Sequence, residues 1–212
     1  MPAGWVVERP PGSIAERHGA EPSFDARRVL IHEVDDVAVV VGSGQRVMPA
    51  VEGMAMVRRR SGGGAVLVGP GEVLWVDVLL PRGDPLWCDD ISRSVAWLGG
   101  AWCAALAEMN VEATVHHGPM VATRWSEVVC FAGVGPGEVL VGGRKVVGIS
   151  QRRNRGGARF QCAALLRWRP GEMVRLFGLQ PEQVASADLQ ESAVGLGVDA
   201  GELAEALLGR LP

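Results

Sequence analysis

The chain has 212 residues, of which 48% are hydrophobic and 21% are charged, and its formal net charge is -3. A chain of this length and composition folds around a core and buries roughly 70% of its unfolded surface. The near-neutral charge argues against a nucleic-acid binder and against charge-driven attachment to anionic membranes. No run of about 18 apolar residues occurs, and residues 1–19 lack the apolar segment of a signal peptide, so we expect a cytoplasmic protein.

Short apolar segments predict many strands along the first part of the chain. A mixed, proline-containing stretch over residues 1–28 is expected to cover part of a sheet edge. The candidate strands that follow lie at 29–33, 37–41, 55–59, 65–68 and 73–80. Within 73–80, alternate residues give one fully apolar face and one mostly apolar face, which is typical of a buried strand.

The strongest helix signal covers residues 90–109, and Asp89 or Asp90 is expected to cap it. Apolar residues recur there at helical spacing: Ile91, Val95, Leu98, Trp102, Ala105 and Met109. Further strands are expected at 112–115, 128–131, 138–141, 145–151 and 159–168, and two helices at 181–187 and 200–208. Together these elements predict an α+β fold in which a mixed β-sheet is packed with helices.

A glycine turn follows three arginines at the end of a candidate strand. Successive glycines allow backbone N–H groups to converge on an anion or a carbonyl oxygen, and arginine adds permanent positive charge. The turn is no P-loop, because no Gly-Lys-Ser/Thr follows it. A hairpin turn beside a solvated basic run fits the local pattern equally well. The segment is Arg58-Arg59-Arg60-Ser61-Gly62-Gly63-Gly64-Ala65-Val66.

A second glycine pair, at 142–143, is expected to join two strands into a hairpin. Lys145 then begins an apolar strand, where it is either partly desolvated and aimed into a cleft or simply exposed. A basic loop at 151–157 follows, but aromatic residues make up only 5% of the chain and none interleave with its arginines, so RNA binding is not favoured.

Cys130 lies after an apolar pair and before a Gly/Pro loop, a common position for a nucleophile. A thiolate needs a positive neighbour, and the hairpin could bring Lys145 close to it. Most free cysteines are instead small buried hydrophobes. The wide spacing of Cys88, Cys103, Cys130 and Cys162 argues against a zinc knuckle, and the adjacent His116 and His117 make a poor metal pair, so no metal site is expected.

Taken together, these segments resemble the lipoate–protein ligase and lipoyl/octanoyl transferase family, a relative of the biotin protein ligases. Residues 59–66 look like the family's RRxSGGGAV turn, and residues 143–153 are similar to its GRKxxGxxQRR segment, in the same order and at a similar separation. The resemblance covers residues 29–168. It implies a biotin/lipoate protein ligase catalytic-domain fold with an acyl tunnel beside the glycine turn, and we expect a single such domain over 1–212 without a C-terminal accessory domain.

The resemblance also implies the site. Lys145 and Cys130 are the expected catalytic residues, because a Cys-Phe pair precedes the lysine in the amidotransferase branch of the family. The expected substrate-binding residues are Arg60, Ser61, Gly62, Gly63, Gly64, Ala65, Gly148, Ser150 and Arg152. Two features weaken the ATP-using interpretation: residues 67–71 replace the ligases' usual His-Asp, and 212 residues leave no room for an accessory domain.

Three functions follow from this resemblance. The leading one is transfer of a lipoyl or octanoyl group through an acyl-enzyme on Cys130 to a lysine of a lipoyl-domain protein, of the 2-oxoacid dehydrogenase E2 or glycine cleavage H protein type. An acyl carrier protein is a possible donor. The second is an ATP- and Mg²⁺-dependent ligase that forms an acyl-adenylate beside Lys145. The third is a non-catalytic relative that binds lipoyl groups. No nucleic acid or membrane partner is expected.

Overall fold

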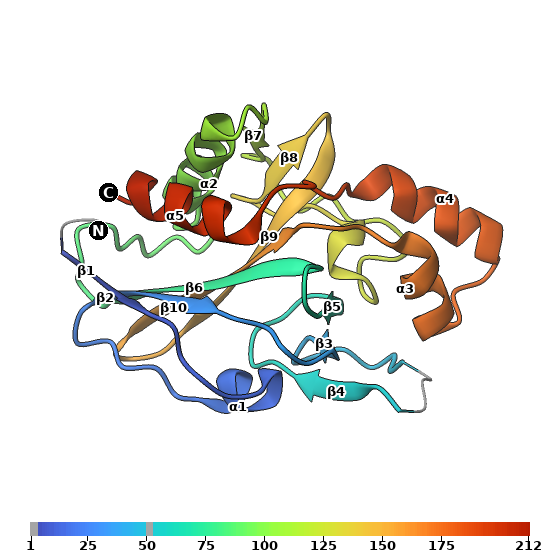
Figure 1. The fold of residues 1–212 in the computed structure, drawn as a ribbon, viewed down its shortest axis with the longest axis horizontal. Helices are drawn as coiled ribbons and strands as arrows, with labels where there is room; N and C mark the ends of the chain where they lie inside the picture. The colour runs from blue at the N-terminus through green and yellow to red at the C-terminus, as the bar shows by residue number, and fades with distance from the viewer. Residues whose placement is uncertain (1–3, 50–52) are drawn as a thin grey trace.

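The computed structural model describes residues 4–49 and 53–212, so the first three residues of the expected edge-covering stretch lie outside it. Ten strands, five α-helices and one 3₁₀ helix are assigned in these residues (Figure 1). None of the described helices is both long enough and apolar enough to span a bilayer. The mixture of sheets and covering helices confirms the expected α+β class.

A seven-stranded sheet forms the centre of the molecule, with the spatial order β1-β2-β6-β10-β9-β8-β7. The pair β1/β2 is parallel and all other pairs are antiparallel. The stretch expected to cover a sheet edge instead supplies the edge strand itself. The strands are β1 (Trp5–Glu8), β2 (Arg27–His32), β6 (Val73–Pro81), β7 (Thr114–Val115), β8 (Val139–Val141), β9 (Arg144–Arg153) and β10 (Gly157–Leu165).

The two faces of this sheet carry different chemistry. Apolar side chains of one face pack under α2 (Ala96–Glu108) and α5 (Ala200–Arg210), which lie together on that side (Figure 1). The opposite face carries the alternate residues, and the strand register aligns them in rows. One row is Trp75, Ala163 and Gly148, and the next is Asp77, Gln161 and Ser150. Because side chains alternate along a strand, the polar groups Asp77, Gln161 and Ser150 all lie on this second face.

A three-stranded sheet, in the order β4-β3-β5, lies beside the second face (Figure 1). Its strands are β3 (Ala38–Val41), β4 (Ala55–Arg58) and β5 (Val66–Val68), and β3 is fully buried. The short helix α1 (Ile14–Gly19) packs near it, with Ser13 and Glu16 forming a capping box. The helices α3 (Pro170–Phe177) and α4 (Glu182–Ser192) pack against each other and share a cluster with β3.

Two sequence-based expectations about local structure are wrong. Residues 128–131 form no strand: η1 (Cys130–Ala132) is a 3₁₀ turn, joined to the glycine turn only by a bridge between Ala65 and Val129. The helix expected over 90–109 begins only at Ala96, and its N-cap, Val95, makes no side-chain hydrogen bond. The carboxylate of Asp90 instead accepts hydrogen bonds from the N–H groups of Ser92 and Arg93, which holds residues 91–95 in turns.

The C-terminal helices are longer and more numerous than expected. The segment expected as a helix over 181–187 extends to Ser192, and α3 before it was not predicted. Pro170 at its first position is favourable because its missing N–H is not needed there. Gly178 ends α3 in the left-handed conformation, with φ of 56°.

Candidate active site

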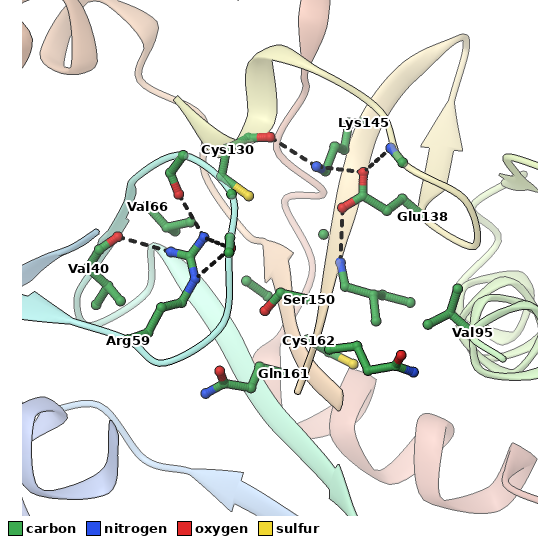
Figure 2. A pocket seen from close by; sticks show the side chains of 18 of the residues that line it. Val40, Arg59, Val66, Val95, Cys130, Glu138, Lys145, Ser150, Gln161 and Cys162 are labelled. Carbon is green, nitrogen blue, oxygen red and sulfur yellow. Dashed lines mark hydrogen bonds and ion pairs between the residues drawn. The ribbon is translucent and has the colours of Figure 1, made fainter. Parts of the chain in front are cut away.

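A cavity of about 380 Å³ lies between the polar face of the large sheet, the glycine turn, η1 and the β8–β9 hairpin. Figure 2 shows side chains from these separate elements directed into one space. The strand β5 and residues 91–95 before α2 close its remaining sides. The lining residues used below are His18, Arg59, Gly62, Gly63, Gly64, Trp75, Cys130, Glu138, Lys145, Gly148, Ser150 and Gln161.

Arg59 lies inside the glycine turn rather than beside it. Its side chain is buried and donates hydrogen bonds to the carbonyl oxygens of Gly62 (2.7 Å), Gly64 (2.8 Å) and Val40 (3.2 Å) (Figure 2). No described carboxylate lies within ion-pair distance of it. The carbonyl groups of Gly62 and Gly64 therefore point toward the Arg59 guanidinium, and the N–H groups of the turn point elsewhere. Among the described residues, none accepts a hydrogen bond from the N–H of Gly62, Gly63 or Gly64.

The glycine turn is fastened to the segment that carries Cys130. The N–H of Ala65 donates to the carbonyl of Val128 (2.7 Å), and the N–H of Cys130 donates to the carbonyl of Ala65 (2.9 Å). A Cβ on Gly64 would lie 2.6 Å from the carbonyl carbon of Val129, closer than real contacts allow. Glycine at this position is thus required for the approach of the two backbones.

Lys145 is 2% exposed, and all three of its ammonium hydrogens have acceptors. Its Nζ lies 2.7 Å from a carboxylate oxygen of Glu138 and donates to the carbonyl oxygens of Cys130 (3.0 Å) and Gly133 (3.1 Å) (Figure 2). Glu138 is itself buried and also accepts from the N–H groups of Gly135 and Ile149. Lys145 and Glu138 therefore form an ordered ion pair in which both charged groups have hydrogen-bond partners.

A register shift in the β8–β9 hairpin aims Lys145 at this site. Leu140 pairs with Lys145, yet the adjacent Val139 pairs with Val147, so β9 carries one extra residue. The bulge places both Val146 and Val147 in the same core cluster as the buried residues of α2, while Lys145 faces the cavity. The Gly-Gly turn expected at 142–143 joins the strands, with φ of 55° and 79°, as a tight hairpin turn requires.

The two buried cations respond differently to their surroundings. Burial lowers the pKa of Arg59, and the negative charge of a Cys130 thiolate opposes this change. Burial also acts to lower the pKa of Lys145, but attraction to Glu138, and then to Cys130, outweighs it and raises that pKa. Lys145 is therefore a permanent cation near neutral pH and not a base or nucleophile.

The far end of the cavity is built from aromatic and amide groups. The ring of His18 stacks on Trp75 with centroids 4.2 Å apart, and His32 stacks near Trp75 at 3.9 Å. Beneath them Asp77 is fully buried between His32 and Arg159, whose hydrogen bonds and charge hold its pKa below the ordinary value although burial acts in the opposite direction. Burial lowers the pKa of His18 to about 4, so its ring is neutral.

The residues expected from sequence fall into three groups. Lining the cavity are Cys130, Lys145, Gly62, Gly63, Gly64, Gly148 and Ser150. Ser61 and Ala65 are buried behind the wall, where the hydroxyl of Ser61 donates to Gln161. Arg60 and Arg152 lie outside it: both are exposed, and Arg60 pairs with Glu21 and donates to the carbonyl of Gly19.

Several cavity residues have no place in the expected site. Arg59 belongs to the glycine-turn motif, yet the sequence predicts Arg60 as a binding residue, because the pattern does not tell which of two adjacent arginines turns inward. Glu138 could have been found as the acidic residue that precedes the hairpin of Lys145. His18 and Gln161 carry no local signal, since each reaches the cavity only through the packing of distant elements.

Comparison with known proteins identifies the family of the chain. The sequence model of the lipoyl protein ligase A/B catalytic domain family matches residues 15–195. Comparison with curated proteins yields no match.

Solved structures similar to this chain include the bi-partite lipoate protein ligase from Thermoplasma acidophilum, with a TM-score of 0.72 and 15% identity over 97% of this chain and 81% of that one. Lipoate-protein ligase A bound with ATP has a TM-score of 0.68 and 18% identity, over 98% of this chain and 83% of that one. LipL1 of P. falciparum in complex with lipoate has a TM-score of 0.67 and 14% identity, over 98% and 61%.

At these identities the solved structures show a shared fold, while the family match covers most of the sequence. The chain therefore belongs to the family of the lipoyl protein ligase A/B catalytic domain and is an enzyme of the lipoyl/octanoyl acyltransferase or lipoate–protein ligase type.

Proposed function

We propose that this enzyme transfers a lipoyl or octanoyl group to a lysine of a lipoyl-domain protein through an acyl-enzyme on Cys130. The observation that carries the proposal is that Cys130 lines the same cavity as the two buried cations Arg59 and Lys145. Its side chain is half-buried, and in Figure 2 its sulfur is directed toward the space between them. A thiolate is the reactive form of cysteine, and neighbouring cations favour it.

In the first step, the Cys130 thiolate attacks the carbonyl carbon of an acyl thioester carried by a donor such as an acyl carrier protein. The bond from that carbon to the donor sulfur breaks, and the departing thiolate takes up a proton from solvent. In the second step, the neutral amine of the target lysine attacks the new thioester, an amide forms, and the Cys130 thiolate leaves while the amine loses a proton. No oxidant or reductant is needed.

The surrounding groups suit the negative oxygen that develops in each step. The Gly62–Gly64 amides donate to no described residue, so they are available to an oxyanion. Lys145 donates to the carbonyl groups of Cys130 and Gly133, and with Glu138 it holds the segment that carries the nucleophile in position. Because Glu138 already neutralises Lys145, this part of the site fits an uncharged thioester better than a free carboxylate.

We propose a lipoyl-domain protein as the acceptor and an acidic carrier domain as the donor. The T. acidophilum relative was studied together with an E2 lipoyl domain, which supports an acceptor of the 2-oxoacid dehydrogenase E2 or glycine cleavage H protein type. The exposed Arg60 and Arg152 lie outside the cavity wall, where they can contact an acidic carrier or acceptor domain. We propose that residues 1–212 act as one catalytic domain.

The test is mass spectrometry of the purified chain after incubation with octanoyl carrier protein. We expect a mass increase of one acyl group on Cys130, its passage to an added lipoyl domain, and loss of both in Cys130→Ala. Cys88→Ala is the matched control, because Cys88 is equally half-buried but does not line the cavity. Full transfer by Cys130→Ala would overturn the covalent mechanism.

An ATP-dependent ligase is the second candidate, and the uncompensated charge of Arg59 favours it. A buried guanidinium that pairs with no carboxylate of residues 4–49 and 53–212 suits a phosphate, as do three glycine amides that donate to none of these residues. ATP with Mg²⁺ would serve there as the substrate that activates lipoate, held by Arg59, Lys145 and the turn. This candidate predicts pyrophosphate release with lipoate and ATP, unchanged in Cys130→Ala.

A further inference from the structure

The end of the cavity opposite Cys130 contains an aligned chain of hydrogen bonds. The hydroxyl of Ser61 lies 2.9 Å from that of Ser150 and donates to the amide oxygen of Gln161 at 2.8 Å. With its oxygen used in this way, Gln161 turns its NH₂ group to Nδ1 of His18, at 3.3 Å. Figure 2 shows Ser150 and Gln161 together below the reacting groups.

This chain fixes the tautomer of His18. An amide NH₂ only donates, so Nδ1 of the neutral ring accepts, and the ring hydrogen is on Nε2. His18 is 6% exposed and lines the cavity, and among the described residues no atom accepts a hydrogen bond from Nε2. The described residues therefore leave this N–H to a bound molecule or water, and the ring that carries it lines the cavity.

The distance to this donor matches the length of an acyl chain. Gly148 lies against the side chain of Lys145, since a Cβ added there would be 3.2 Å from Lys145 Cε. Trp75 is in the same row of the sheet as Gly148, two strands away, which is about 10 Å. An eight-carbon acyl group with its carbonyl near Lys145 can thus place its far end at Trp75 and His18.

We infer that His18 is a specificity-determining residue that favours a lipoyl group over an octanoyl group in this cavity. The dithiolane sulfurs of a lipoyl group are weak acceptors for the Nε2 hydrogen and make favourable contacts with the Trp75 ring. The methyl end of an octanoyl group would leave that N–H without a partner, which carries a penalty. The inference rests on the proposed acyl-binding function but on neither of its two mechanisms.

The experiment measures binding of lipoamide and octanamide by titration calorimetry, with the whole chain. These neutral probes carry the two acyl groups without a donor, so the result does not depend on turnover. We expect lipoamide to be favoured by about fivefold. His18→Phe, which keeps the stacking on Trp75 but removes the donor, should bring the ratio of affinities close to one.

Two further variants make the result specific. His18→Gln places an amide donor near the position of Nε2 and should retain most of the preference. His117→Phe, an exposed histidine outside the cavity wall, should leave the ratio unchanged. If His18→Phe does not fold, Gln161→Leu, which releases the ring tautomer, should lower the ratio instead.

An unchanged ratio in whichever of His18→Phe and Gln161→Leu folds would overturn the inference. Failure of the proposed function gives a different result. The unsubstituted chain then transfers no acyl group, although it still binds both probes.

Discussion

Arg59 and Lys145 are two buried cations on one cavity, and the fold neutralises them in different ways. Within the part of the chain that the structure describes, only backbone carbonyls hold Arg59, whereas Lys145 is paired with the carboxylate of Glu138 and held by two carbonyls. Carbonyl dipoles orient a cation but leave its full charge, while a carboxylate cancels it. The difference indicates that Arg59 attracts negative charge into the cavity and that Lys145 provides a fixed point of contact.

Lys145→Met should have the largest effect, because it removes one member of the buried ion pair. We expect acyl transfer to fall about 10³-fold, because the carbonyl of Cys130 loses its donor and the carboxylate of Glu138 is left uncompensated beside the developing oxyanion. The protein should also lose about 3–5 kcal/mol of stability, since Glu138 is left buried without its partner. Steady-state transfer and urea unfolding measure the two effects.

A double-mutant cycle separates these effects. Lys145→Met with Glu138→Gln should recover much of the stability but none of the transfer. If the double variant is as unstable as the single one, the ion pair is not the reason for the loss.

Gly64→Ala should disturb the carbonyl groups that hold Arg59 and the hydrogen bonds that join the glycine turn to the Cys130 segment. The new Cβ would meet the backbone of Val129 at 2.6 Å, so the turn must move, and misplacement by about 1 Å can reduce the rate about 10²-fold. Gly44→Ala is the matched control, since its Cβ would meet nothing within 4 Å and Gly44 does not line the cavity. Equal transfer rates for the two variants would contradict the close approach.

The neutral His18 at the other end of the cavity should make stability depend on pH. Its pKa is lowered from 6.5 to about 4 in the folded protein, so the unfolded chain binds the proton more tightly. The stabilisation is complete above about pH 6.5 and is lost as pH falls toward 4, by about 3 kcal/mol in total. Urea unfolding over this range, compared with His18→Phe, isolates the contribution, and identical pH profiles would exclude it.

Arg59→Lys should have the smallest effect of the four. A lysine keeps the charge but cannot reproduce the planar set of bonds to Val40, Gly62 and Gly64, which leaves at least one buried carbonyl unpaired. We expect a loss of about 1–2 kcal/mol in stability and about tenfold in transfer. Transfer as low as in Lys145→Met would show that the shape of the cation, and not only its charge, is needed.

The sequence predicted the parts of the site that depend on local patterns. The Gly-Gly hairpin before Lys145 and most strands follow from turn residues and alternation. The segment at Cys130 looked like a strand because Val128 and Val129 are apolar, but only one bridge pairs it, so it closes into a 3₁₀ turn. Periodicity likewise overestimated the long helix, because the side chain of Asp90 satisfies the amides of a separate turn.

The remaining parts of the site depend on tertiary packing. No local rule places His18 opposite Gln161 or chooses Arg59 over Arg60, since each choice is made by contacts between segments far apart in the chain. The bulge that turns Lys145 away from Val146 and Val147 is also a property of strand pairing and not of the hydrophobic pattern.

The two backbone hydrogen bonds between Ala65 and the Val128–Cys130 segment affect the order in which the protein folds. They close a long loop that contains β6 and α2, so their entropic cost is recovered only once the central sheet has formed. The glycine turn and the cysteine cannot assemble as a separate unit. Copying both motifs onto another scaffold would therefore not transfer the activity without the sheet that brings them together.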